Sequence, residues 1–216
     1  MAALIIACSK CAASPGHTAQ PFQPTSTAIT FLSKSWERDL LKDVRSALES
    51  LSQDHALVKG SASVGEANAV APNLASSDLV FVDPPYSAVQ YSRFYHVLEA
   101  VAVGKADTVF GVGRYPPREH RPTSAYSSTA QSLGAFEDLL EKLAKSQATV
   151  VLTFPDHQCS NGISGDAVRE ISAQHFRVVE SAVSSVFSTM GGSTTGIAKR
   201  SARRHASELI LLLRPH

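Results

Sequence analysis

The sequence predicts an α/β fold, with a sheet whose centre is largely parallel and helices packed against it. Four runs of apolar and β-branched residues have the length of strands, and they span 78–83, 148–154, 177–187 and 207–213. The first three are separated by helical segments, and strands that alternate with helices are typical of a parallel sheet. The last two are joined without a helix, which predicts an antiparallel hairpin at the edge of the sheet.

Five segments are expected to form helices, most of them because apolar residues recur at steps of three and four. The pattern is clear where Trp36, Leu40, Val44 and Leu48 follow one another. Gly104 is expected to end the third helix, since glycine favours the left-handed conformation found after helices. The expected helices span 2–13, about 34–52, 88–104, about 129–146 and about 165–175. Residues 55–60 are expected to form a short strand, and 14–30 and 105–128 to form loops.

The composition indicates a globular chain. Of 216 residues, 44% are hydrophobic and 18% are charged, which excludes both a disordered chain and a membrane protein. The net charge of +1 confines any nucleic-acid surface to a local patch. The apolar start, Met1 to Cys8, is far shorter than the roughly 20 residues of a membrane-spanning helix, and it predicts a helix that follows a missing segment or docks on another chain. We therefore expect residues 1–216 to form a single, partial domain.

The cysteines indicate a reducing compartment. Cys8, Cys11 and Cys159 cannot form a closed set of disulfides, which is expected of thiols in the cytoplasm. Cys8 and Cys11 form a Cys-x-x-Cys pair, but a zinc site needs a second pair of ligands, and the spacing of the other cysteine and histidines offers none. No metal is expected.

One tetrapeptide is suited to chemistry. Asp83-Pro84-Pro85-Tyr86 directly follows an apolar strand, and ligands of open α/β sheets bind beyond the carboxyl ends of strands. The Asp83 side chain and the Pro84 carbonyl can both accept hydrogen bonds from an exocyclic amino group. The two prolines fix φ and remove competing donors. Tyr86 offers a face on which an extruded base can stack. The alternative, a rigid turn without function, is weakened by the strand before the motif and the helix after it.

In these residues the chain resembles the adenine-specific, amino-methylating DNA methyltransferases, and in particular bacterial site-specific methylases. The resemblance extends from the tetrapeptide to four further segments, at 14–22, 91–99, 160–165 and 208–213, and so spans most of the chain. It implies a Rossmann-like methyltransferase fold, S-adenosylmethionine as methyl donor and N6 of adenine in double-stranded DNA as acceptor. By this resemblance, Asp83 and Pro84 hold the amino group and Tyr86 stacks on the flipped base.

The sequence departs from that family in its cofactor loop. The family carries an aromatic-x-Gly-x-Gly loop upstream of the tetrapeptide, and nothing in residues 1–77 matches it. Phe110-Gly-Val-Gly comes after the motif and leads into Arg-Tyr-Pro-Pro rather than a helix, so it is interpreted as a chance match. Ser61 occupies a place where the family often has an acidic residue near the adenosine of the cofactor. The chain therefore looks like the C-terminal portion of a methylase that lacks its cofactor-loop portion.

Two clusters of basic residues are candidates for DNA contacts, because Lys and Arg neutralise backbone phosphates. The alternative is that these basic residues are solvated loop charges with no role in binding. The candidate DNA-binding residues, with two polar residues that follow the tetrapeptide, are Ser87, Tyr91, Arg114, Arg118, Arg121, Arg200, Arg203 and Arg204.

Two functions therefore remain open. The first is a base-flipping adenine-N6 DNA methyltransferase. The second is a truncated or split half that binds DNA or a partner chain, with that partner supplying the glycine-rich loop. Methylation of RNA or of a protein glutamine is a weaker third possibility, since protein-glutamine enzymes generally have Asn at the position of Asp83.

Overall fold

The structure is a computed structural model that describes residues 1–14, 17–18, 22–54, 56–111, 113–188 and 203–216, with backbone alone for 185–188 and 203–206. Its contacts divide the chain into two compact units. Unit 1 comprises Met1–Ala62 and Tyr91–Thr123, and unit 2 comprises Ser63–Gln90 and Ser124–His216. Each unit is thus assembled from two separate stretches of sequence. That the two units together form one catalytic domain stays a prediction.

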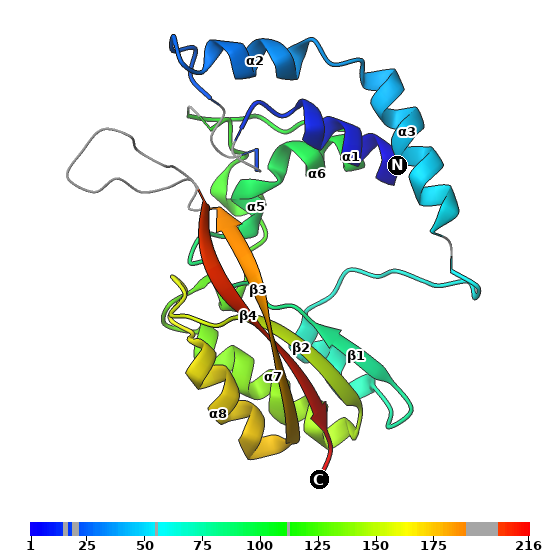
Figure 1. Cartoon of the computed structure of the whole chain (residues 1–216), viewed down its shortest axis with the longest axis vertical. Coiled ribbons are helices and arrows are strands. Elements are labelled where there is room, and N and C mark those ends of the chain that lie inside the picture. The colour runs from blue at the N-terminus through cyan, green and yellow to red at the C-terminus, as the bar shows by residue number, and fades with distance from the viewer. Residues whose placement is uncertain (15–16, 19–21, 55, 112, 189–202) are drawn as a thin grey trace, which may run out of the picture. The chain divides into compact units, whose positions relative to one another are not determined.

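Unit 2 is built on a four-stranded mixed sheet in the order β1-β2-β4-β3 (Figure 1). The strands are β1 (Leu79–Val82), β2 (Thr149–Pro155), β3 (Arg177–Ser188) and β4 (Arg203–Arg214). β1 and β2 are parallel, whereas β4 runs antiparallel to both β2 and β3. The expected hairpin at the edge is confirmed. The expected largely parallel centre is wrong, because β4 lies beside β2 and runs antiparallel to it.

The core of unit 2 lies on one face of this sheet. Alternate residues of β2 are buried, as are Leu209, Leu211 and Leu213 of β4. Two helices, α7 (Ser132–Ser146) and α8 (Gly165–His175), contribute apolar residues to the same core. Figure 1 shows both helices on the same side of the strands. The short α4 (Ala67–Val70) and two 3₁₀ turns, η1 (Ala71–Asn73) and η3 (Ala125–Ser127), pack against α7.

The opposite face of the sheet is apolar as well. Phe81, Val151, Leu212 and Val179 form one row across the four strands. Phe81 is 67% exposed and Val179 is 56% exposed, so this row is left open within unit 2. Sheets that contain parallel strands are usually covered on both faces, and a row of this kind is typical of a surface that another segment covers.

Unit 1 is helical. Its helices are α1 (Ala2–Cys11), α2 (Ile29–Trp36), α3 (Leu40–Gln53), α5 (Tyr91–Phe94) and α6 (His96–Val103). α1 contacts α2, α3 and α6, and Ala3 and Ala7 are buried there. His17 stacks on Phe94 with ring centroids 4.7 Å apart. A 3₁₀ turn, η2 (Arg118–His120), lies in the loop after α6.

Three helix and strand predictions are corrected in unit 1. The helix expected at 34–52 is two helices, because Asp39 caps α3 by accepting a 3.0 Å hydrogen bond from the Lys42 backbone N–H. The helix expected from residue 88 begins at Tyr91 and is broken at Tyr95, although Gly104 ends it at φ 74° as predicted. Residues 56–60 form no strand.

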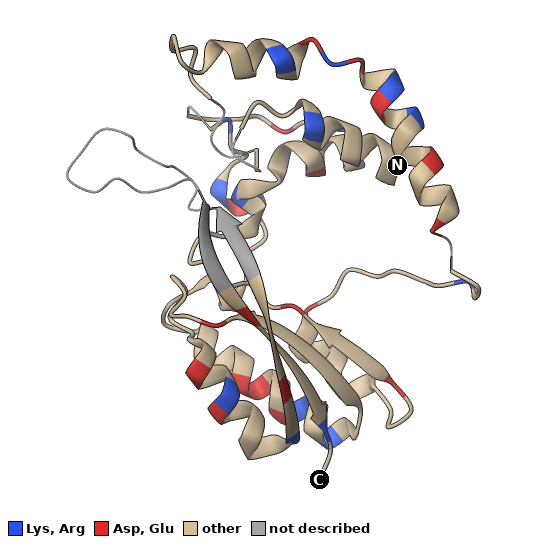
Figure 2. Cartoon of the chain, in the orientation of Figure 1, with Lys and Arg blue, Asp and Glu red and all other residues tan. Residues whose placement is uncertain are grey.

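Charged residues on the surface of unit 2 gather around one arginine. Both α7 and α8 carry acidic and basic residues (Figure 2). Arg169 of α8 forms a bidentate pair with Asp156, at 2.8 and 2.9 Å, and also bonds Glu180 of β3 at 3.0 Å. The hydrogen bonds from Arg169 hold the pKa of Asp156 below its usual range. The network ties the end of β2 to α8 and β3.

Replacing Arg169 by Gln is expected to lower the free energy of unfolding by about 1–3 kcal/mol at pH 7, because charge-assisted hydrogen bonds are lost. The lowered pKa of Asp156 contributes stability above its unfolded pKa, near 3.9, and loses it as the pH falls through the folded pKa. The difference between variant and wild type should therefore shrink below about pH 4. Urea unfolding from pH 3 to 7 measures it. Lys145→Gln, which breaks an exposed pair with Glu141, is the control and should leave the free energy of unfolding nearly unchanged.

Candidate active site

The Asp83-Pro84-Pro85-Tyr86 segment leaves the carboxyl end of β1, as predicted, next to the parallel strand β2. The Thr153 hydroxyl of β2 donates to Asp83 Oδ1 at 3.3 Å. Asp83 is exposed, and its Oδ2 accepts no hydrogen bond from any residue that the structure describes. Pro84 is buried beneath it, and Tyr86 is 47% exposed. The motif thus has the carboxylate of Asp83 and the ring of Tyr86 at the surface, while Pro84 is buried.

A buried asparagine fixes this segment from below. Asn161 is fully buried, and its side-chain amide donates to the Pro85 carbonyl at 2.9 Å and to the Tyr126 carbonyl at 3.0 Å. Its side-chain Oδ1 accepts a hydrogen bond from the Ile163 N–H, and its backbone carbonyl accepts one from the Ser132 hydroxyl. Because every polar group of the asparagine side chain is engaged, its orientation is fixed. The backbone of Pro85 is held by that orientation.

The rest of the loop is anchored at two further points. The Ala88 N–H donates to Ser160 Oγ at 3.1 Å. Gln90 and Ser124 form a reciprocal pair, in which the Gln90 amide donates to the Ser124 carbonyl and the Ser124 N–H donates back. A loop held at both ends and in its middle keeps its acceptor groups in place without help from a ligand.

A cavity of about 390 Å³ adjoins the motif within unit 2. Asp83, Pro84 and Pro85 line it together with apolar residues of β1, α4 and α7. Its other carboxylate is Glu66, which precedes α4. No Lys, Arg or His is among the residues that line it. The lining suits an uncharged, planar group that carries hydrogen-bond donors.

Beside the cavity lies a second polar network. The Tyr126 hydroxyl donates to Asn68 Oδ1 at 2.5 Å, and the Asn68 amide donates to Asp138 at 2.7 Å. Burial raises the pKa of Tyr126, so the phenol stays protonated and remains a donor. This network joins α4 to α7 beside the cavity, of which Tyr126 is a lining residue.

The structure distributes the predicted DNA-contact residues over both units. Ser87 is half-buried in unit 2, where its hydroxyl accepts from the Val89 N–H. Tyr91 opens α5 in unit 1 and stacks on Tyr95. Arg114, Arg118 and Arg121 lie in the loop after α6, and Arg114 adopts a left-handed φ of 48°.

The second predicted cluster is described only in part. Arg200 lies outside the described residues. The backbones of Arg203 and Arg204 form the start of β4, paired with the end of β3, and their side chains are not described. Their roles, like those of the other contact residues, stay predictions.

The geometry around Asp83 does not provide a complete site for S-adenosylmethionine. The cavity has no cationic side chain that could neutralise the carboxylate of the cofactor, and no glycine-rich turn after a strand lines it. Ser61 lies in the exposed, extended segment that ends the first stretch of unit 1, and it is not among the lining residues. The residues beside Asp83 fit the target base better than the methyl donor.

Metal binding and thiol chemistry are two other possibilities in the part of the chain that the structure describes. No cluster of three or more His, Cys, Asp or Glu side chains there could hold a metal ion. Burial raises the pKa of the Cys159 thiol to about 11, so it is protonated at neutral pH. Among the described helices, none has the length and apolar character needed to cross a membrane.

Comparison with known proteins now gives the motif its context. Residues 14–150, which include Asp83 to Tyr86, match the D12 class N6 adenine-specific DNA methyltransferases. The chain belongs to this family. The D12 assignment confirms the resemblance drawn from the tetrapeptide, and it makes adenine in DNA the substrate class and S-adenosylmethionine the methyl donor of the family.

A curated relative supports the same assignment. The chain is similar to the modification methylase LlaI of Lactococcus lactis subsp. lactis, with 39% identity over 69 residues. That stretch covers 32% of this chain and 11% of LlaI, so the chain spans only a small part of its relative. No solved structure matches the chain significantly.

Sequence reasoning missed the residues that hold Asp83-Pro84-Pro85-Tyr86 in place. Asn161 and Ser160 belong to a segment that carried the family resemblance, but no role was predicted for either of them. An asparagine next to a glycine ordinarily indicates a turn. Thr153 appears only as one residue of an apolar strand. The pairing of β1 with β2 could have found it. Val82, the last residue of β1, pairs with Leu152, and Thr153 is the next residue along β2, level with Asp83.

Proposed function

We propose that this chain is an adenine-N6 DNA methyltransferase, in which an adenine extruded from duplex DNA is held at Asp83 to Tyr86. The observation that carries the proposal is the unshared Asp83 Oδ2 at the carboxyl end of β1, on a loop anchored by Asn161. Family membership supports the substrate class.

The roles of the residues follow from the chemistry of an exocyclic amine. The Asp83 carboxylate accepts a hydrogen bond from one N6–H, and the Pro84 carbonyl accepts one from the other. These two bonds favour a pyramidal nitrogen, whose lone pair is withdrawn from conjugation with the ring and becomes nucleophilic. Tyr86 stacks on the base, and Pro85 prevents the loop from offering a competing N–H. This is catalysis by positioning and hydrogen bonding.

The experiment that tests this proposal is transfer of a radiolabelled methyl group from S-adenosylmethionine to duplex DNA, followed by hydrolysis to nucleosides. The expected product is N6-methyldeoxyadenosine. Label in cytosine would overturn the base assignment. Transfer to RNA or to protein, and none to DNA, would overturn the substrate class.

A second candidate function is favoured by the open apolar row Phe81–Val151–Leu212–Val179 and by the lack of a cationic group beside Asp83. In this case the chain binds DNA, and a partner chain supplies the glycine-rich cofactor loop. Calorimetric titration of the purified chain with S-adenosylmethionine separates the two. Saturable binding favours the self-sufficient enzyme, whereas no heat of binding favours the partner-dependent half.

A further inference from the structure

One tyrosine of unit 1 gathers two arginines around its ring. The Cζ atoms of Arg93 and Arg121 lie 4.8 and 5.7 Å from the centroid of the Tyr115 ring, within the range of cation–π attraction. Arg93 comes from α5 and Arg121 follows η2, so the two guanidinium groups reach the ring from separate segments. His96 of α6 packs on the same ring at 5.1 Å. Attraction to the ring holds together like charges that would otherwise separate.

These two guanidinium groups have no acidic partner among the residues that the structure describes. Neither Arg93 nor Arg121 forms one of the ion pairs found there. The Nε of Arg121 is buried and has no hydrogen-bond partner in the described residues. A buried guanidinium N–H without an acceptor costs free energy, since its water has been removed and nothing replaces it. Two neighbouring guanidinium groups without an acidic partner are suited to binding an anion.

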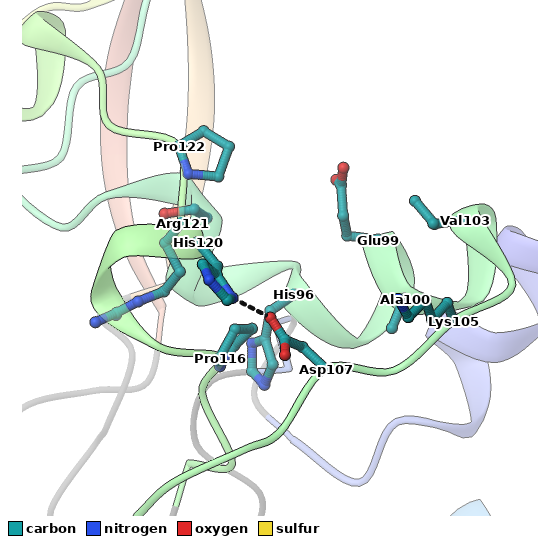
Figure 3. Close-up of a pocket in the computed structure, with 11 residues that line it drawn as sticks. His96, Glu99, Ala100, Val103, Lys105, Asp107, Pro116, His120, Arg121 and Pro122 are labelled. Atoms are coloured by element: carbon teal, nitrogen blue, oxygen red, sulfur yellow. Dashed lines mark hydrogen bonds and ion pairs between the residues drawn. The ribbon is translucent and has the colours of Figure 1, made fainter.

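Two carboxylates of unit 1 belong to a cavity that one of the arginines borders. Arg121 also borders a cavity of about 430 Å³ that Glu99, Asp107 and His120 help to line. Asp107 accepts a 2.6 Å hydrogen bond from His120, which holds its pKa below the usual range. Figure 3 shows the Arg121 side chain extending away from Glu99 and Asp107. The arginine pair thus borders this cavity through Arg121, but neither Glu99 nor Asp107 forms an ion pair with either arginine.

A tight turn holds Tyr115 in place. The backbones of Phe110 and Tyr115 exchange two hydrogen bonds, of 2.8 and 3.0 Å, across this turn. Gly113 lies directly against the tyrosine ring, since a Cβ at that position would come within 2.4 Å of its Cε2 atom. Any other residue at 113 would push the ring aside. Gly113 thus offers a way to move Tyr115 without changing any charge.

We propose that Arg93 and Arg121, arranged by Tyr115, form a clamp for a phosphodiester group of the DNA backbone. Arg121 was already a candidate for DNA contact, whereas Arg93 and Tyr115 carried no predicted role. Guanidinium groups bind phosphate oxygens through paired N–H donors, and two of them lie around one ring here. The clamp rests on the proposed function, because it takes duplex DNA as its ligand. It adds a contact that positions the duplex and reads no base.

The test is the salt dependence of duplex binding, measured by fluorescence anisotropy between 50 and 300 mM salt. Each phosphate contact contributes about 0.9 to the slope of log affinity against log salt. Arg93 and Arg121 share one phosphodiester group, so the double variant loses that one contact and is expected to lower the slope by about 0.9. Arg93→Gln and Arg121→Gln are each expected to lower the slope by less than the double variant. Arg45→Gln removes an exposed arginine of α3 and is the matched control, with an unchanged slope.

Two variants separate the clamp from simple charge loss. Gly113→Ala should lower the slope although it removes no charge, because the ring that aligns the arginines is displaced. Tyr115→Phe, which keeps the ring, should retain the wild-type slope. The clamp is refuted if the double variant keeps that slope, or if the wild-type chain binds inorganic phosphate and deoxyadenosine monophosphate but no duplex.

The same titrations on a duplex built only from G·C pairs keep this test independent of the proposed function. A phosphate clamp gives the same changes in slope there. Loss of methyl transfer with intact slopes would count against the adenine site alone, and intact transfer with unchanged slopes in the double variant would count against the clamp alone.

Discussion

Replacing Asp83 by Ala is expected to reduce methyl transfer to adenine by about 10²–10³-fold, under any conditions in which the wild-type chain supports transfer, with or without a partner. The loss corresponds to about 3–4 kcal/mol of transition-state stabilisation, the usual cost of removing one preorganised hydrogen-bonding group from an active site. The fold should be unaffected, because Asp83 is exposed and bonds only Thr153 among the described residues. Single-turnover rates, with thermal unfolding as the check on folding, measure both effects.

Two companion variants test whether the carboxylate acts as an acceptor of hydrogen bonds. Asp83→Asn keeps one acceptor oxygen and should lose less activity than Asp83→Ala. Thr153→Val removes the hydroxyl that bonds Asp83 Oδ1 and should cost a few-fold at most, since Oδ2 stays available. Turnover of Asp83→Ala at the wild-type rate would remove this residue from the mechanism.

The local features of the fold were predictable from the sequence, and the order of its strands was not. β1, β2 and the cap at Gly104 follow from runs and residue types within a few positions of one another. The place of β4 between β2 and β3 depends on which strand pairs with which, and no local pattern records that. The break between α2 and α3 was missed because the apolar periodicity continues through it, while Asp39 begins a new helix.

The candidate site divides in the same way. Asp83 to Tyr86 could be found because four adjacent residues carry the chemistry and a strand precedes them. Asn161 could not, since it lies 76 positions beyond the Pro85 carbonyl that it holds. The bond depends on how the loop after β2 folds back under the loop after β1. Residues that support a catalytic segment are therefore less visible in a sequence than the segment itself.

Asn161 accordingly carries the second large expected effect. Replacing Asn161 by Ala is expected to lower the free energy of unfolding by about 2–5 kcal/mol, because the part-buried carbonyl of Pro85 and the buried carbonyl of Tyr126 would lose their donor. For a chain of this length each kcal/mol shifts the midpoint of thermal unfolding by about 2–4 °C. Asn73→Ala is the matched control, since that exposed asparagine makes one long bond of 3.4 Å, and it should change stability by under about 0.5 kcal/mol.

The same substitution separates support of the motif from simple stabilisation of the fold. Asn161→Asp fills the same space but cannot donate, and it places a charge against two carbonyl oxygens, so it should be at least as harmful as Asn161→Ala. At a temperature where Asn161→Ala is still fully folded, methyl transfer should remain below the wild-type rate, because the Pro85 backbone no longer fixes Asp83 and Tyr86. Wild-type transfer by the folded variant would restrict Asn161 to a structural role, and a loss of stability under about 1 kcal/mol would contradict the hydrogen bonds assigned to it.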